Sequence, residues 1–226
     1  MIPEIGHFAL ILALALAVCQ TIIPMVGAHR GNAAMMGVAR TAATGQFLFV
    51  AISFACLIYA FLTSDFSVLY VANHSQLALP TLYKVSAVWG AHEGSLLLWI
   101  LLQSAWTVAV ARFSSGVPEA FAARVISVLG FLSIGFLLFA LLTSNPFDRL
   151  IPAPADGGDL NPLLQDPGLA IHPPLLYVGY VGFSVAFAFA IAAMISGNLD
   201  PVSYTHLRAH ETVLVISYAV FCLKRG

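Results

Sequence analysis

The sequence predicts an all-α fold, a polytopic transmembrane bundle of about five membrane-spanning helices. Of its residues, 60% are hydrophobic and only 8% are charged, against about 25% charged in a typical soluble domain. Several apolar segments also reach the length of about 20 residues that crosses a bilayer. Because these segments are unbroken rather than alternating, we expect helices, which satisfy their backbone hydrogen bonds internally, and not strands. The net charge of −1 offers no basic surface for a nucleic acid.

The predicted helices belong to one membrane region, residues 1–200, in contact with lipid. They lie near residues 6–28, 45–64, 86–111, 125–143 and 175–195. The first has no basic start and too long an apolar run for a cleavable signal peptide. Two longer polar segments, residues 65–85 and 145–174, follow the second and fourth helices.

The basic residues predict how the bundle is oriented, because cytoplasmic loops are enriched in Lys and Arg. The loops after the first and third predicted helices carry Arg30, Arg40, Arg112 and Arg124. The other two loops carry only Lys84 and Arg149, together with several aspartates. We therefore expect the N-terminus and residues 65–85 and 145–174 to face outward, on the side away from the cytoplasm.

The last segment of the sequence, residues 201–226, differs in character from the rest. It begins Pro-Val-Ser-Tyr-Thr-His-Leu-Arg-Ala-His-Glu-Thr and resembles the translation of a sequencing adapter. We interpret it as non-native, which removes His206, His210 and Cys222 from the candidate ligands. The alternative is a sixth helix over residues 213–223, which is short for a membrane span.

His172 is the main candidate for a functional side chain. Pro173 and Pro174 follow it, which predicts an extended conformation at His172 and a helix that begins at the prolines. The imidazole then projects from a rigid corner at the outer membrane face, and neutral imidazole is a good axial ligand for haem iron. On the residues alone, a capping or interfacial histidine is the favoured interpretation.

Two groups of polar residues accompany this histidine in the prediction. A loop rich in proline and glycine precedes His172 and is expected to support it, through Asp159, Asn161, Gln165 and Asp166, with Pro173 and Pro174 after it. A second polar cluster, formed by Trp89, His92 and Glu93, lies near the outer end of the third helix. The alternative for this cluster is a polar helix start, where Gly90 and Gly94 allow close helix packing.

The segments 89–99 and 156–193 resemble the N-terminal part of the CcmF family, haem lyase subunits of bacterial cytochrome c maturation, which includes a related nitrite reductase branch. The block Leu-Asn-Pro-Leu-Leu-Gln-Asp-Pro-Gly-Leu-Ala-Ile-His-Pro-Pro-Leu-Leu-Tyr carries this resemblance most specifically, and the likeness extends over residues 1–200. It implies haem as cofactor, and as partners a haem chaperone, other maturation subunits and apocytochrome c.

The resemblance also assigns a role to one position of this sequence. His172 matches the first of two outward histidines that bind haem iron in the family. The tryptophan-rich segment, the second outward histidine and the membrane-embedded haem ligands lie downstream in the family and are absent here. We therefore expect haem lyase activity of the parent protein and not of this fragment alone.

Two other functions are compatible with a bundle of this kind. A subunit of an ion-coupled transporter needs carboxylates or lysines in mid-membrane, and only Glu93 comes near such a position. A structural assembly factor without haem contact leaves His172 as an interfacial cap.

Overall fold

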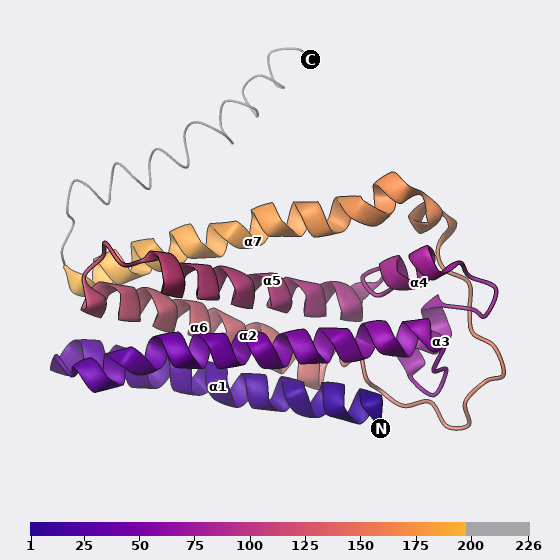
Figure 1. The fold of residues 1–226 in the computed structure, drawn as a ribbon, viewed down its shortest axis with the longest axis horizontal. Helices are drawn as coiled ribbons and strands as arrows, with labels where there is room; N and C mark the ends of the chain where they lie inside the picture. The colour runs from indigo at the N-terminus through magenta and orange to yellow at the C-terminus, as the bar shows by residue number, and fades with distance from the viewer. Residues whose placement is uncertain (198–226) are drawn as a thin grey trace, which may run out of the picture.

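The computed structural model describes residues 1–197, which form a bundle of long helices with short helices gathered at one end (Figure 1). The long helices are α1 (Ile2–Arg30), α2 (Ala33–Leu62), α5 (His92–Phe113), α6 (Glu119–Leu142) and α7 (Pro167–Ser196). The short ones are α3 (Leu69–His74), α4 (Thr81–Ala87) and the 3-10 helix η1 (Pro162–Gln165). Residues 1–197 contain no β-strand, so the all-α prediction is confirmed. The expectation for residues 201–226 lies outside the described residues.

All five long helices are long and apolar enough to cross a membrane, as the sequence predicts. Their ends differ from the predicted ones in two places that bear on the site. The third membrane helix begins at His92, because residues 88–91 form a turn between α4 and α5. The fifth begins at Pro167 and not at residue 175.

The first two helices form a tight antiparallel hairpin. Gly31 ends α1 in the left-handed conformation, with φ 65°, which glycine adopts without steric cost. The Asn32 side chain then caps α2 by accepting a hydrogen bond from the Met35 backbone N–H at 3.1 Å. The turn is therefore only two residues long, and α1 and α2 pack along their whole length.

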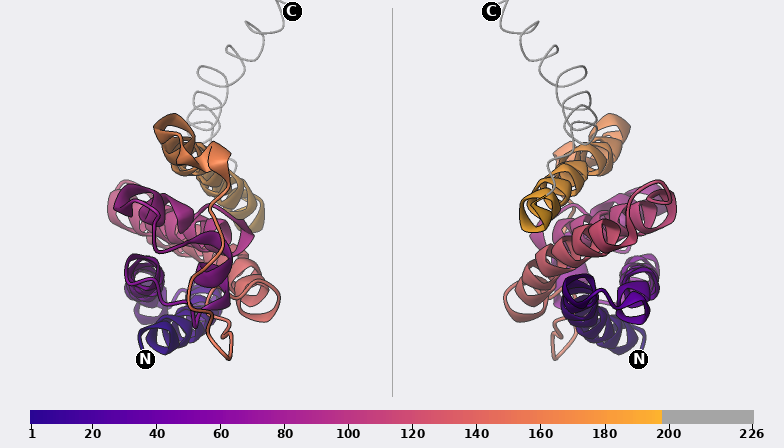
Figure 2. Two further views of the ribbon diagram at one scale, coloured as in Figure 1. Left: turned by 90° about the vertical axis from the view of Figure 1, so that its right-hand side faces the viewer. Right: turned by 90° about the vertical axis from the view of Figure 1, so that its left-hand side faces the viewer.

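The remaining long helices are added to this hairpin in layers, as the two end-on views show (Figure 2). Helix α6 packs on α1 and α5, and α5 also packs on α2. Helix α7 lies on the outside, against α5 and α6, and is the least buried of the five. Leu10, Leu57, Leu97 and Leu137 lie in the main core. Buried polar side chains within residues 1–197 are only Gln, Ser and Thr.

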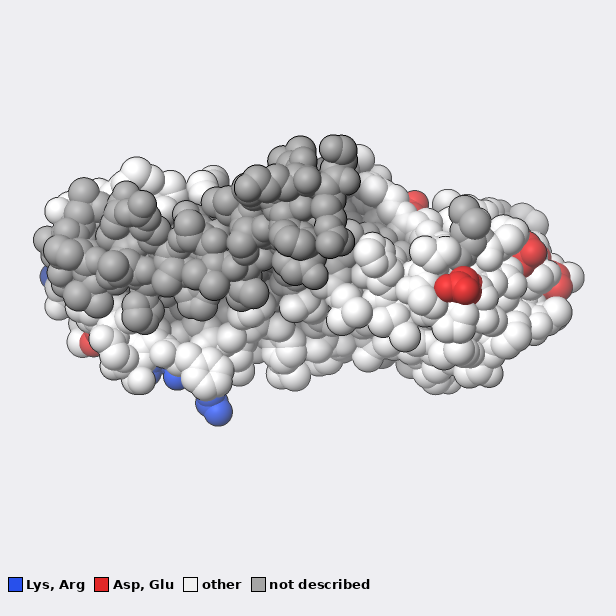
Figure 3. Space-filling view, turned by 90° about the horizontal axis from the view of Figure 1, so that it is seen from above, with Lys and Arg blue, Asp and Glu red and all other residues white. Residues whose placement is uncertain are grey.

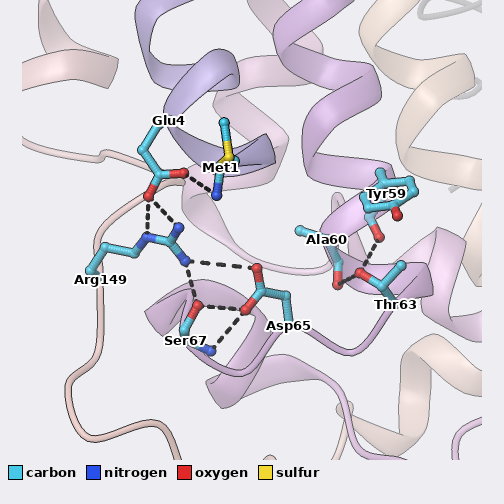
Figure 4. A network of polar contacts seen from close by, with 8 residues as sticks. All are labelled: Met1, Glu4, Tyr59, Ala60, Thr63, Asp65, Ser67 and Arg149. Carbon is cyan, nitrogen blue, oxygen red and sulfur yellow. Dashed lines mark hydrogen bonds and ion pairs between the residues drawn. The ribbon is translucent and has the colours of Figure 1, made fainter.

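The N-terminus, residues 63–91 and residues 143–166 lie at the same end of the bundle, which we call the loop-bearing end (Figure 1). A polar network joins these three segments through Arg149 (Figure 4). Its guanidinium binds Glu4, which also pairs with the amino group of Met1 at 2.7 Å. On its other side Arg149 contacts Ser67 and, at 3.7 Å, Asp65. The end of the bundle is thus a connected structure and not a set of separate loops.

Charge is divided between the two ends (Figure 3). The loop-bearing end carries most of the acidic side chains in residues 1–197, namely Glu4, Asp65, Glu93, Asp148, Asp156, Asp159 and Asp166. The opposite end carries Arg30, Arg40, Arg112 and Arg124 with a single carboxylate, Glu119. The two groups of loops that differ in charge in the sequence therefore lie at opposite ends of the structure.

Candidate functional site

The site is built around the start of α7. Asp166 is the N-cap residue, and its Oδ1 accepts hydrogen bonds from the backbone N–H groups of Gly168 at 2.8 Å and Leu169 at 3.1 Å. Pro167 occupies the first helical turn, where a missing N–H costs nothing and a fixed φ suits the helix. Together they start the helix before the histidine.

The predicted conformation at His172 is therefore wrong. His172 is helical, and Pro173 and Pro174 lie in the second turn of α7 and not at its start. The preference of a residue before proline for an extended backbone is real. Here the Asp166 cap and Pro167 outweigh it, and the two prolines are accommodated inside the helix.

The His172 side chain is exposed at the loop-bearing end. Within residues 1–197 its imidazole makes no hydrogen bond, ion pair or ring contact. The other described histidines at this end differ. His92 Nδ1 lies 2.7 Å from Ser144 Oγ, His74 Nδ1 lies 2.9 Å from the Tyr70 carbonyl, and His7 Nδ1 lies 3.4 Å from Asn145 Oδ1. His172 is thus the imidazole at this end that remains available to an external ligand.

Hydrogen bonds to its acidic side chains fix the loop before α7. Asp159 Oδ1 accepts hydrogen bonds from the side-chain amides of Gln76 at 3.0 Å and Gln165 at 3.4 Å. Gln165 also donates to the Leu160 carbonyl at 3.1 Å. The Asn161 backbone carbonyl accepts a hydrogen bond from the Leu164 N–H at 2.8 Å. The structure therefore brings Asp159 and Gln165 together, and places Asp166 at the helix cap.

Gly157 lets this loop pack directly on the end of α3. A Cβ atom there would lie 2.1 Å from the Ser75 carbonyl oxygen, so only glycine fits. The neighbouring Gly158 N–H donates to the Ala72 carbonyl at 2.6 Å. The loop is therefore held by backbone contacts as well as by its carboxylates.

The second predicted cluster is divided by the structure. Trp89 reaches α7, where its Nε1–H donates to the Ala170 carbonyl at 2.9 Å. His92 instead faces α6, against Ser144 and the ring of Phe139. Glu93 lies in the first turn of α5, a favourable place for an acidic side chain. Of the three, Trp89 is the one whose side chain forms a hydrogen bond, within residues 1–197, with the helix that carries His172.

Tyr70 organises this region, and sequence reasoning missed it. Its buried hydroxyl lies 3.0 Å from the Val88 carbonyl and 3.3 Å from the Ala87 carbonyl, at the end of α4, and accepts the Ala91 N–H at 3.2 Å. Burial raises the pKa of Tyr70 above its usual value, so the hydroxyl stays a proton donor. These partners lie 17 to 21 residues away in the sequence, and no local motif points to them.

The donor set suits haem iron better than a bare metal ion. In residues 1–197 no three His, Cys, Asp or Glu side chains form a group that can hold a metal. One exposed imidazole on a capped helix can fill one axial position of a haem, whose other ligands come from the porphyrin and elsewhere.

Comparisons with known proteins show which family the chain resembles. CcmF, a cytochrome c-type biogenesis protein of Pseudomonas aeruginosa, is 64% identical over 201 residues, which are 88% of this chain and 31% of the relative. The Escherichia coli protein of the same name is 57% identical over 201 residues, with the same coverage. A solved structure of the cytochrome c haem lyase CcmF matches with a TM-score of 0.76 and 30% identity, over 88% of this chain and 31% of that one.

The chain thus spans about a third of the length of these relatives, 31% in each. Its long apolar helices and its bacterial relatives indicate a multi-pass inner-membrane protein. Residues 89–210, more than half of the chain, match the family model described as cytochrome C assembly protein. These matches confirm the resemblance found in the sequence, and the chain belongs to the cytochrome C assembly protein family.

Proposed function

We propose that the parent protein binds haem and delivers it to apocytochrome c, as part of an inner-membrane haem lyase complex, and that His172 is an axial ligand of the haem iron. The single observation that supports this role is the free imidazole of His172. Of the described histidines at the loop-bearing end, it is the one without an intramolecular partner.

The residues around His172 serve to hold this imidazole in place. Asp166 fixes the first turn of α7, and Asp159 and Gln165 fix the loop that leads into it. A ligand on a capped helix loses little conformational freedom when it binds iron, which favours binding. Haem itself supplies the vinyl groups to which the two thiols of an apocytochrome Cys-x-x-Cys-His site add.

The proposed topology places the loop-bearing end in the periplasm. The clustering of Arg30, Arg40, Arg112 and Arg124 at the opposite end supports this, by the excess of basic residues in cytoplasmic loops. A haem chaperone, other maturation subunits and apocytochrome c would then meet the protein on the side where His172 is exposed.

Haem retention by the full-length parent protein tests the role of His172. We expect His172→Ala to lower haem affinity by about tenfold or more and to change the absorption spectrum of the haem that remains. Added imidazole should partly restore that spectrum, because it can replace the lost ligand. His29→Ala is the matched control, an exposed histidine at the end of α1 and at the opposite end of the bundle. An unchanged spectrum in His172→Ala would remove this residue from the ligand set.

The transporter alternative finds no support in the structure. Within residues 1–197 no Asp, Glu, Lys or Arg side chain is buried, so this part of the chain holds no buried carboxylate or lysine for a proton relay. The relatives found are cytochrome c biogenesis proteins.

A further inference from the structure

Pro174 leaves a backbone acceptor without a partner in the helix that carries His172. In an α-helix the N–H of each residue donates to the carbonyl four residues earlier. Proline has no N–H, so Pro174 cannot donate to the carbonyl of Ala170, inside α7. Ala170 is buried, so bulk water cannot supply a hydrogen bond to this carbonyl, and leaving it unpaired would cost stability.

Trp89 supplies the missing donor. Its indole Nε1–H donates to the Ala170 carbonyl at 2.9 Å, a normal hydrogen-bond length. The acceptor lies two residues before His172 in the same helical turn. Membrane helices tolerate proline because neighbouring helices, side chains, waters or local changes of the helix satisfy the freed backbone groups.

The position of Trp89 is itself fixed from several sides. Its carbonyl accepts a hydrogen bond from Ser95 Oγ at 2.7 Å, and its N–H donates to the Ser86 carbonyl at 3.3 Å. The Tyr70 hydroxyl holds the carbonyls on the preceding turn. Gly94 allows this approach, because a Cβ there would lie 1.6 Å from the Val88 carbonyl oxygen and 2.7 Å from the Tyr70 hydroxyl.

The other two of the three tryptophans also contact α7. The Trp99 ring meets the Tyr177 ring at 5.9 Å, edge to face. Trp106 Nε1–H donates to the Val178 carbonyl at 3.1 Å. That carbonyl lies in mid-helix, where the N–H of residue 182 also serves it, so Trp106 does not fill a vacancy left by a proline.

From this geometry we infer that Trp89 is a positioning residue for His172: its indole N–H replaces the backbone donor that Pro174 lacks and thereby fixes the orientation of the imidazole toward haem iron. This inference rests on the proposed role of His172. Of the second polar cluster, only Trp89 is then given a role in positioning His172. His92 and Glu93 are given none. The coupling predicted here runs between Trp89 and Pro174, through one carbonyl oxygen.

The test is a double-mutant cycle in the full-length, haem-loaded parent protein. Trp89→Phe keeps an aromatic ring but removes the N–H, and Pro174→Ala restores a backbone N–H that can serve the Ala170 carbonyl. We expect Trp89→Phe alone to lower haem affinity about tenfold, in the range of lost outer-shell partners, and to shift the electron paramagnetic resonance signature of the iron. In the Pro174→Ala background the Trp89→Phe change should have no further effect, so the double variant should match Pro174→Ala in haem affinity and in iron signature. Trp106→Phe is the matched control, since it leaves no carbonyl unpaired, and should leave the iron signature unchanged.

Two results would overturn the inference while the proposed function stands. One is a His172→Ala variant that loses haem beside a Trp89→Phe variant with a wild-type iron signature. The other is a Trp89→Phe defect that Pro174→Ala does not repair, which would make Trp89 a general packing residue. If Trp89→Phe fails to accumulate, it is compared within the Pro174→Ala background, where failure to recover would also refute the inference. A wild-type haem spectrum in His172→Ala instead refutes the proposed function, and the inference with it.

Discussion

At the scale of single residues, the site depends on groups whose partners are far away in the sequence. Trp89 and the Ala170 carbonyl are separated by 81 residues, and Gln76 and Asp159 by 83. Each of these contacts satisfies a polar atom at the loop-bearing end, where helix ends and prolines leave many unpaired groups. The surroundings of His172 thus depend on tertiary contacts as well as on its sequence neighbours Gln165 and Asp166.

Gly94 provides a direct test of this close packing. Gly94→Ala should destabilise the protein by about 1–3 kcal/mol, since the added methyl group meets the Val88 carbonyl and such overpacking forces the backbone to shift. Thermal unfolding in detergent measures the effect. Gly37→Ala is the control in a helix, because nothing lies within 4 Å of the added Cβ. There the better helix propensity of alanine should raise stability by up to about 1 kcal/mol. Equal effects at the two positions would contradict the close approach at Gly94.

At the scale of elements, the apolar pattern of the sequence predicts the membrane helices but not the short helices between them. The five membrane helices follow from long apolar runs, which stay helical in lipid whatever their neighbours are. The short helices α3 and α4 were not predicted, because at six and seven residues they are too short to be stable alone. Tyr70 on α3 holds the end of α4, so each depends on the other.

The start of α7 shows a different limit. Asp166 followed by Pro167 is a helix-start signal that is visible in the sequence. Pro173 and Pro174 gave a competing signal seven residues later, and the sequence alone does not show that Trp89 would satisfy the Ala170 carbonyl. The sequence therefore identifies His172 as a candidate ligand. It does not predict the helical conformation of His172 or the contact of Trp89 with the same helix.

The Asp166 cap should be measurable by itself. Asp166→Ala should weaken the first turn of α7 by about 1 kcal/mol, the usual contribution of an N-cap side chain. Hydrogen exchange of the backbone amides at residues 168–172 should become faster in this variant. Asp166→Ser retains an N-cap oxygen and should exchange as the original protein does. Unchanged exchange in Asp166→Ala would mean that the loop contacts, and not the cap, hold the helix start.

At the scale of the whole molecule, acidic and basic side chains are separated toward opposite ends of the bundle. Its acidic loop-bearing end lies opposite the end with Arg30, Arg40, Arg112 and Arg124, which we call the arginine-bearing end, and the helices between them carry almost no charge. The fold and the division of the loops follow from composition and from the positions of the basic residues. The layered order of the helices is not evident from the sequence, because α1, α5 and α6 are all apolar along most of their length and their order depends on tertiary packing.

Cysteine labelling can test the proposed orientation. In a variant without Cys19, Cys56 and Cys222, a cysteine at exposed Ala155 should react with a membrane-impermeant thiol reagent in spheroplasts. A cysteine at exposed Gly116, at the arginine-bearing end, should react only after the membrane is permeabilised. We expect a difference of tenfold or more in labelling rate, because the reagent reaches only one side, and the reverse pattern would invert the topology.

The separation of charge along the bundle has an energetic consequence for an energised cell. Each unit charge carried across a potential of 100 mV changes the free energy by about 2.3 kcal/mol. With the arginine-bearing end inside, an interior-negative potential attracts that end and repels the carboxylates opposite. In the proposed orientation, the membrane potential therefore adds to the preference that the basic residues of the loops already set.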